Sequence, residues 1–107
     1  MNYKVLTISP FDKQLKRLVK KFPSLKEEFA KLIEVLELNP YKGTPVGNNY
    51  YKVRLAISSK GKSGGARIIT NVVVQETTVF LLSIYDKSEK QNITDKELIE
   101  LLKEVPE

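Results

Sequence analysis

The N-terminal part of the chain shows one strand-like and two helix-like patterns of hydrophobic residues. Residues 3–8 are rich in Tyr, Val, Thr and Ile and stop at Ser9 and Pro10, which predicts a strand. Apolar side chains then recur three or four residues apart in two stretches separated by Pro23: Phe11, Leu15, Leu18, Val19 and Phe22, and then Leu25, Phe29, Leu32, Ile33 and Leu36. We expect two helices that fold back as a hairpin, because almost no chain connects them.

Polar residues at the expected helix starts support these boundaries. Ser9 is the predicted cap of the first helix, and Ser24 and Glu27 have the spacing of a capping box for the second. Thr94 and Glu97 repeat that spacing near the C-terminus. They precede a third helical pattern, which is formed by Leu98, Leu101, Leu102 and Val105.

The middle of the chain predicts three consecutive strands. After a loop at 41–49 that is rich in Gly, Pro and Asn, apolar and polar residues alternate over 51–58, and β-forming runs follow at 66–74 and 78–85. Short connections between such strands predict an antiparallel meander. The order strand, helix, helix, strand, strand, strand, helix indicates an α+β fold, with a small antiparallel sheet packed on the N-terminal helical hairpin and a C-terminal helix. We expect one domain that covers residues 1–107.

The amino-acid composition limits which catalytic groups the chain can use. The chain has no cysteine and no histidine, which excludes disulfides and thiolate catalysis and removes the commonest general base and metal ligand. We therefore expect no metal and no cofactor, and chemistry based on Lys, Arg, Tyr, Ser or carboxylates. No apolar run approaches the roughly 20 residues of a membrane helix, and residues 1–9 lack a signal-peptide pattern. The expected location is the cytoplasm, with no membrane partner.

The formal net charge of +5 is distributed unevenly along the chain. Residues 38–75 contain no acidic side chain, whereas after Gln91 five acidic residues stand against two lysines. The acid-free window contains six cations: Lys42, Lys52, Arg54, Lys60, Lys62 and Arg67. A one-sided surplus of this kind is typical of a face that binds a polyanion, although a solvated basic loop is the alternative.

The segment 60–65 reads Lys-Gly-Lys-Ser-Gly-Gly, which resembles the end of a phosphate-binding P-loop. That interpretation fails, because Ala56 stands where the motif needs glycine and a β-forming run follows in place of a helix. Two interpretations remain, a glycine-rich loop that approaches a phosphate and a mobile solvent loop.

Strand geometry suggests a convergent basic site. Lys52 and Arg54 share one face of their strand, and antiparallel pairing would bring later residues beside them. The candidate site residues outside the glycine-rich loop are Lys52, Arg54, Arg67, Tyr85, Lys87 and Lys90. A nucleic-acid phosphate would neutralise such a cluster. The alternative is that Arg54 and Arg67 pair with Asp86 or Glu89.

RNA cleavage suits these residue types. The 2′-hydroxyl of RNA can attack the neighbouring phosphate, so a protein needs to supply only proton transfer and charge stabilisation. A lysine among other cations holds its proton less tightly, which makes Lys60 and Lys62 candidate general bases.

Several strings, in this order, resemble the RelE/ParE toxin superfamily over nearly the whole chain. They are the helix opening at 11–18, Leu-Asn-Pro at 38–40, Tyr-Lys-Val-Arg at 51–54 and Ala-Arg-Ile-Ile at 66–69. Residues 59–65 and 81–89 are most similar to the HigB-type branch.

This resemblance implies the toxin of a type II toxin–antitoxin system, a ribosome-dependent mRNA endoribonuclease (mRNA interferase) that inhibits translation. Arg54 and Arg67 match the family's phosphate-holding residues, Lys60 and Lys62 resemble its loop lysines, and Tyr85 stands where a late-strand aromatic or acid-base residue occurs. The implied catalytic residues are Lys60, Lys62, Arg67 and Tyr85, and the implied RNA-binding residues are Lys52, Arg54, Lys87 and Lys90. RelE has a further arginine near its last strand, whereas no arginine follows Arg67 here, so that Lys87 or Lys90 would take its place.

The resemblance also implies partners and leaves alternatives open. The expected partners are the ribosome with its mRNA, a cognate antitoxin protein and an operator DNA complex formed through that antitoxin. A ParE-like inhibitor of DNA gyrase would have the same fold. A noncatalytic nucleic-acid-binding module, in which Tyr50 and Tyr51 stack on bases, is the third possibility.

Overall fold

The computed structural model describes residues 2–58, 64–90 and 92–105. Lys60 and Lys62, two of the predicted catalytic residues, lie outside these ranges. The helices are α1 (Ser9–Lys21), α2 (Leu25–Leu38) and α3 (Asp95–Leu102). The strands are β1 (Lys4–Thr7), β2 (Thr44–Gly47), β3 (Tyr50–Leu55), β4 (Ala66–Val73) and β5 (Thr78–Asp86), with a 3-10 turn at Val74–Glu76 before β5.

The strands form one sheet in the order β1-β5-β4-β3-β2. Strands β3, β4 and β5 pair antiparallel in sequence order, which confirms the predicted meander. The helical hairpin carries the chain across the sheet, so that β1 pairs with β5 in parallel. The predicted α+β architecture is therefore confirmed.

Strand β2 is a departure from the sequence prediction, which placed a loop at 41–49. It pairs antiparallel with the start of β3, with Thr44 opposite Lys52 and Pro45 opposite Tyr51. All four of its residues are exposed. An edge strand tolerates proline and needs no buried side chains, so the periodicity of the sequence carried no signal for it.

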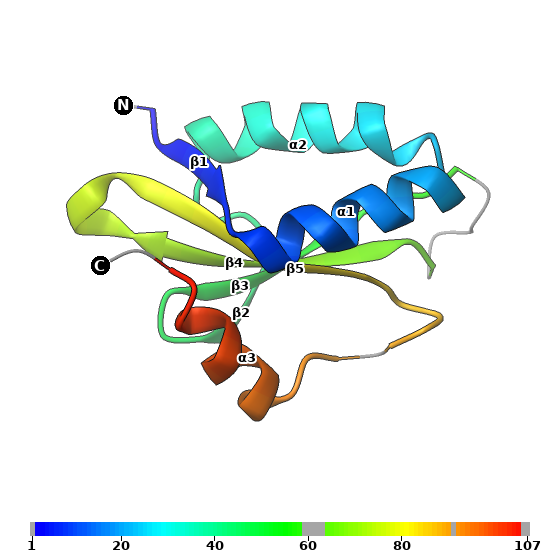
Figure 1. The fold of residues 1–107 in the computed structure, drawn as a ribbon. Coiled ribbons are helices and arrows are strands. Elements are labelled where there is room, and N and C mark those ends of the chain that lie inside the picture. Colours follow the sequence, from blue (N-terminus) through cyan, green and yellow to red (C-terminus); the bar gives the residue numbers. More distant parts are fainter. Residues whose placement is uncertain (1, 59–63, 91, 106–107) are drawn as a thin grey trace.

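Helices cover both faces of the sheet. Figure 1 shows α1 and α2 on one face and α3 on the other. Strand β5 lies between the two helical layers, and each of its nine residues is buried. Its central residues 79–82 are all apolar, as expected for a strand covered on both sides. None of the described helices is long and apolar enough to cross a membrane.

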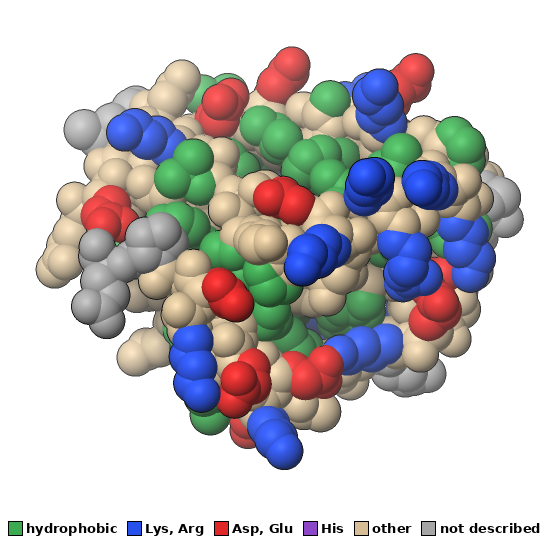
Figure 2. All heavy atoms as spheres, viewed as in Figure 1, with side chains coloured by type: hydrophobic (Ala, Val, Ile, Leu, Met, Phe, Trp, Pro, Cys, Tyr) green, Lys and Arg blue, Asp and Glu red, His purple; other side chains and the backbone are tan. Residues whose placement is uncertain are grey.

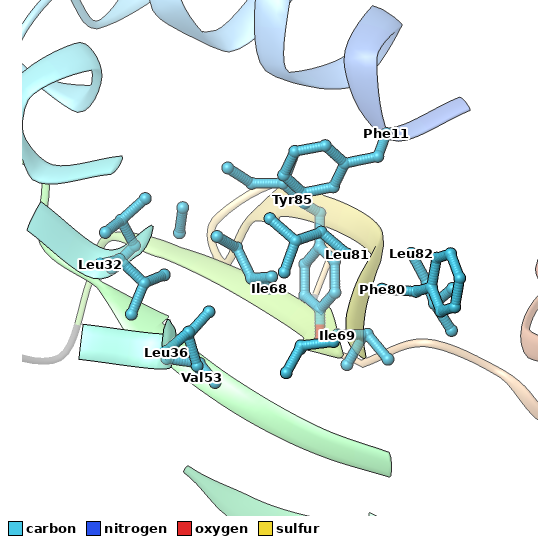
Figure 3. Close-up of a cluster of buried hydrophobic side chains, with 14 of the residues drawn as sticks. Phe11, Leu32, Leu36, Val53, Ile68, Ile69, Phe80, Leu81, Leu82 and Tyr85 are labelled. Carbon is cyan, nitrogen blue, oxygen red and sulfur yellow. The ribbon is translucent and has the colours of Figure 1, made fainter. Parts of the chain in front are cut away.

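The core lies mainly between the helical hairpin and the sheet. Val53, Leu55 and Ile57, the predicted apolar face of β3 and its extension, are all buried. Figure 3 shows Leu36 of α2 close to Val53. The core is completed by fully buried residues from both helices of the hairpin and from the sheet, including Phe11, Leu18, Leu25, Ile68, Leu81 and Leu82.

The helix caps agree only partly with the sequence. Thr94 and Glu97 form the predicted capping box at the start of α3. Ser24 does not cap α2, because it has helical backbone angles and its hydroxyl accepts a hydrogen bond from the Ser58 backbone N–H, 3.4 Å away. Ser9 is already part of α1 and Ile8 occupies the cap position. Backbone N–H groups of the first turn are thus left without these two predicted side-chain acceptors.

Candidate functional site: a basic pocket beside a covered tyrosine

Four cations from three segments line a pocket of about 340 Å³ at one side of the sheet. They are Lys42 before β2, Lys52 and Arg54 on β3, and Arg67 on β4. Arg54 and Arg67 are directly opposite each other in the pairing of β3 with β4. No described acidic residue lines this pocket. Like charges placed opposite each other on a sheet repel, so the arrangement favours a bound anion.

The two arginines differ in how firmly they are held. The Arg67 guanidinium donates hydrogen bonds to the backbone carbonyls of Gly64 and Ala66, at 3.2 and 3.0 Å. Arg54 is exposed and forms no hydrogen bond or ion pair with its side chain to another described residue. Arg67 is therefore preorganised by the backbone, whereas no described residue restrains the Arg54 side chain.

The predicted alternative, in which carboxylates neutralise these arginines, finds no support among the described residues. Glu89 pairs with Arg17 and Lys21 of α1, at 3.4 and 4.0 Å. No described carboxylate forms an ion pair with Arg54 or Arg67.

Tyr85 lies beside this pocket but under a cover. It is opposite Arg67 in the pairing of β4 with β5, and only 5% of its surface is exposed. It lines a second pocket of about 210 Å³, and residues 92–95 and Leu98 are also part of the lining. Its buried hydroxyl has no hydrogen-bond partner among the described residues. Lys52 lines both pockets and connects the two sites.

Burial raises the pKa of the Tyr85 hydroxyl above its ordinary value near 10, and the positive charge of Arg67 opposes this shift. The phenol is therefore protonated at neutral pH. In this state Tyr85 can donate a proton but cannot act as a base.

Two of the predicted RNA-binding residues, Lys87 and Lys90, lie outside the basic pocket. The Lys90 ammonium pairs with Glu97 of α3 and lies 5.8 Å from the centre of the Tyr85 ring. Lys87 follows β5 and its backbone N–H donates to the Gly65 carbonyl. Lys52, which does line the pocket, donates a hydrogen bond to the Asn92 side chain at 3.1 Å.

Lys42 and Gly43 belong to the pocket and were missed as site residues by sequence reasoning. Gly43 has φ +105°, and a Cβ there would lie 2.5 Å from the Lys52 carbonyl oxygen. Only glycine permits this close approach, which brings Lys42 beside β3. The available signal was a Lys-Gly pair inside the acid-free window.

The sequence model of the RelE toxin of the RelE/RelB toxin–antitoxin system matches residues 11–106. The chain belongs to this RelE toxin family, a family of ribosome-dependent mRNA interferases, which are endoribonucleases that inhibit translation.

Solved structures are similar over most of the chain. A double arginine-to-alanine mutant of Escherichia coli RelE in the free state has a TM-score of 0.63 and 17% identity, covering 99% of this chain and 100% of that one. The toxin–antitoxin complex RelBE from E. coli gives 0.54 and 27%, covering 77% and 93%. A metal-bound toxin from Helicobacter pylori gives 0.50 and 27%, covering 84% and 99%.

Proposed function

We propose that this chain cleaves mRNA on the ribosome without a metal ion, by promoting attack of an RNA 2′-hydroxyl on the adjacent phosphate in the basic pocket. The observation that carries the proposal is the convergence of Lys42, Lys52, Arg54 and Arg67 on one pocket that no described carboxylate lines. A scissile phosphate would neutralise these charges, and the negative charge that grows during attack would be stabilised further.

The proposed reaction needs only one group that accepts a proton and one that donates a proton. The 2′-oxygen forms a bond to phosphorus while the bond to the 5′-oxygen breaks, which leaves a 2′,3′-cyclic phosphate and a 5′-hydroxyl. One group accepts the 2′-hydroxyl proton and another donates a proton to the leaving 5′-oxygen. We assign charge stabilisation to Arg54 and Arg67 and the general base to Lys60 or Lys62.

We assign proton donation to Tyr85, because it is opposite Arg67 in the strand pairing and a tyrosine hydroxyl is protonated at neutral pH. This hydroxyl is buried, and residues 92–95 and Leu98 line the same pocket as Tyr85. The covering segment therefore has to move before the hydroxyl can reach RNA. Lys87 and Lys90 are assigned to RNA binding outside the pocket.

The biological setting is also a proposal. Residues 59–65 and 81–89 favour the HigB-type branch, and the composition favours a cytoplasmic toxin. A related toxin was solved in complex with the antitoxin RelB. We propose a cognate antitoxin that covers the basic pocket with acidic side chains, and an operator DNA complex formed through that antitoxin.

The decisive experiment uses ribosomes carrying mRNA with a 2′-deoxynucleotide on the 5′ side of the scissile phosphate. We expect cleavage of the all-RNA message, a 2′,3′-cyclic phosphate end, and no cleavage at the deoxy position. Cleavage of the deoxy message would contradict 2′-hydroxyl attack. Protein that leaves ribosome-bound mRNA intact and blocks DNA supercoiling would establish a gyrase inhibitor in place of a nuclease.

Metal independence has its own test. A sulfur atom in place of a nonbridging oxygen of the scissile phosphate should slow cleavage to the same extent with and without added Cd²⁺. Rescue by Cd²⁺, which binds sulfur strongly, would reveal a catalytic metal at that oxygen and contradict the proposal.

A further inference from the structure

Helix α1 carries a second concentration of positive charge, on the face turned away from the sheet. Lys13, Lys16, Arg17, Lys20 and Lys21 are all exposed. At 3.6 residues per turn, these five side chains fall within an arc of about 140°. Figure 2 shows Lys and Arg side chains gathered over α1. We call these five residues the α1 stripe.

Helix folding does not explain the α1 stripe. Like charges three or four residues apart on a helix repel each other, and the stripe contains several such pairs. The helix dipole favours cations only near the C-terminal end, which accounts for Lys20 and Lys21 but not for Lys13 and Lys16. The unfavourable charges therefore suggest a binding partner.

Helix α2 provides the internal comparison. It packs in the same hairpin and is of similar length, yet it mixes both signs of charge, and Lys31 pairs with Glu28 at 3.9 Å. On α1 the acidic residue Asp12 stands at the edge of the stripe. Glu89 pairs with Arg17 and Lys21, whereas Lys13, Lys16 and Lys20 form no ion pair with a described residue. The surplus is thus specific to α1.

The stripe lies near the catalytic end of the sheet, on the opposite face from α3. The pairs from Arg17 and Lys21 to Glu89 connect the C-terminal half of α1 to the segment after β5. The hydrogen bond between Ser58 and Ser24 brings the turn after α1 beside the end of β3. Figure 1 shows these turns together at one end of the fold, where β4 also begins.

We propose that the α1 stripe binds the phosphate backbone of ribosomal RNA while the basic pocket holds the message; the inference rests on the proposed function. Because the pocket and the stripe lie on different sides of the sheet, one RNA strand in the pocket leaves the stripe available to a second RNA segment. Four of the five cations are lysines, which are mobile point charges suited to phosphate contacts without base reading. The ligand class is therefore structured RNA, recognised by charge and not by sequence.

The test compares two triple variants that remove the same charge. The stripe variant is Lys13→Gln, Lys16→Gln and Lys20→Gln, and the control is Lys26→Gln, Lys96→Gln and Lys103→Gln, all at exposed positions. Binding to 70S ribosomes is measured over a range of salt concentrations. Each phosphate contact contributes roughly 0.7 to 0.9 to the slope of log affinity against log salt. We expect the slope of the stripe variant to fall by about 2 and its affinity to fall at least tenfold, with little change in the control.

Further measurements separate the possible failures. A Lys→Arg triple variant at the same stripe positions should retain the wild-type slope, because it keeps the three positive charges. At saturating ribosomes the stripe variant should cleave at the wild-type rate, because the pocket is intact. A wild-type protein that binds ribosomes without cleaving would sink the proposed nuclease function but leave the slope comparison valid.

Two results would overturn the stripe proposal. One is an identical salt slope for wild type, stripe variant and control. The other is unchanged ribosome binding together with lost binding to poly-L-glutamate, which would assign the stripe to an acidic protein partner.

Discussion

The basic pocket and the Tyr85 pocket lie side by side on the sheet, but they differ in how far their side chains are exposed to a ligand. Arg54 is exposed in the first, whereas only 5% of Tyr85 is exposed in the second. The strand pairing places Arg67 opposite both residues. The two pockets differ in that residues 92–95 and Leu98 line only the Tyr85 pocket. Strand register thus decides which residues become neighbours, and a later segment decides which of them a substrate can reach.

This contrast separates two parts of the proposed chemistry. The arginines can meet a phosphate in the conformation described, because their pocket is open and no described carboxylate competes for it. The Tyr85 hydroxyl requires a movement of its cover. Variants of the pocket should therefore change charge stabilisation, whereas variants under the cover should reveal the role of the buried hydroxyl.

The largest effect is expected from Arg67→Ala. Loss of a preorganised donor to a developing negative charge typically lowers the rate of the chemical step by roughly 10² to 10³. Single-turnover cleavage of ribosome-bound mRNA measures this rate. Arg67→Lys should recover only part of it, because one ammonium cannot reproduce the fork of a guanidinium. Full activity of Arg67→Ala would show that Arg67 takes no part in catalysis.

Arg54→Ala is expected to be the next most damaging. Because Arg54 is exposed and has no described side-chain partner, the free energy of unfolding should change by no more than about 0.5 kcal/mol. The cleavage rate should nevertheless fall by at least about tenfold, the equivalent of one charge-assisted contact. Lys26→Ala, on the exposed side of α2, is the matched control and should change neither quantity.

Gly43→Ala tests how the pocket is built. The new Cβ would lie 2.5 Å from the Lys52 carbonyl oxygen, at a residue with φ +105°. Such strain should lower the free energy of unfolding by about 1–3 kcal/mol, as measured by denaturant unfolding. Gly47→Ala is the control within β2, because its Cβ would come closest to the side chain of Tyr50, at 3.3 Å, and not to the backbone. Equal effects of the two substitutions would show that the close approach of Gly43 to the Lys52 carbonyl does not require glycine.

Tyr85→Phe is expected to have only a small effect on stability. Removing a buried hydroxyl without a described partner should leave the free energy of unfolding unchanged or raise it by up to about 1 kcal/mol. The cleavage rate should fall if the hydroxyl donates its proton to the leaving oxygen. An active Tyr85→Phe variant would assign proton donation to another group.

Tyr85→Phe should also change how the free energy of unfolding depends on pH in alkaline solution. Burial raises the Tyr85 pKa, so above about pH 10 the unfolded chain releases this proton before the folded chain does. The stabilisation is complete below pH 10 and is lost as pH rises through the folded pKa. Tyr85→Phe should therefore reduce the fall of unfolding free energy above pH 10. An identical alkaline slope in both proteins would contradict the burial of this phenol.

Sequence periodicity predicted the elements whose apolar faces are buried. The helical hairpin, the meander and the Thr94–Glu97 capping box all follow from local patterns. Strand β2 escaped prediction because it is exposed along its length, and its pairing with β3 places Lys42 in the site. The cover over Tyr85 also escaped, since it depends on packing between segments that no local pattern specifies.

The candidate site was predictable to the extent that strand register controls it. Arg54 and Arg67 follow from the alternation of β3 and the start of β4, and the structure places them opposite each other. Lys90 was expected beside them because it follows β5, but it pairs with Glu97 of α3. The partner of a charged side chain such as Lys90 depends on the geometry of the folded chain, which the spacing of residues in the sequence does not determine.

A double-mutant cycle on Arg54 and Arg67 tests most directly whether the two arginines act on one phosphate. The single-turnover cleavage rate is measured for wild type, Arg54→Ala, Arg67→Ala and the double variant. If both side chains stabilise the same phosphate, the double variant loses clearly less than the product of the two single losses. A loss equal to that product would show that the arginines act independently and would contradict a shared catalytic pocket.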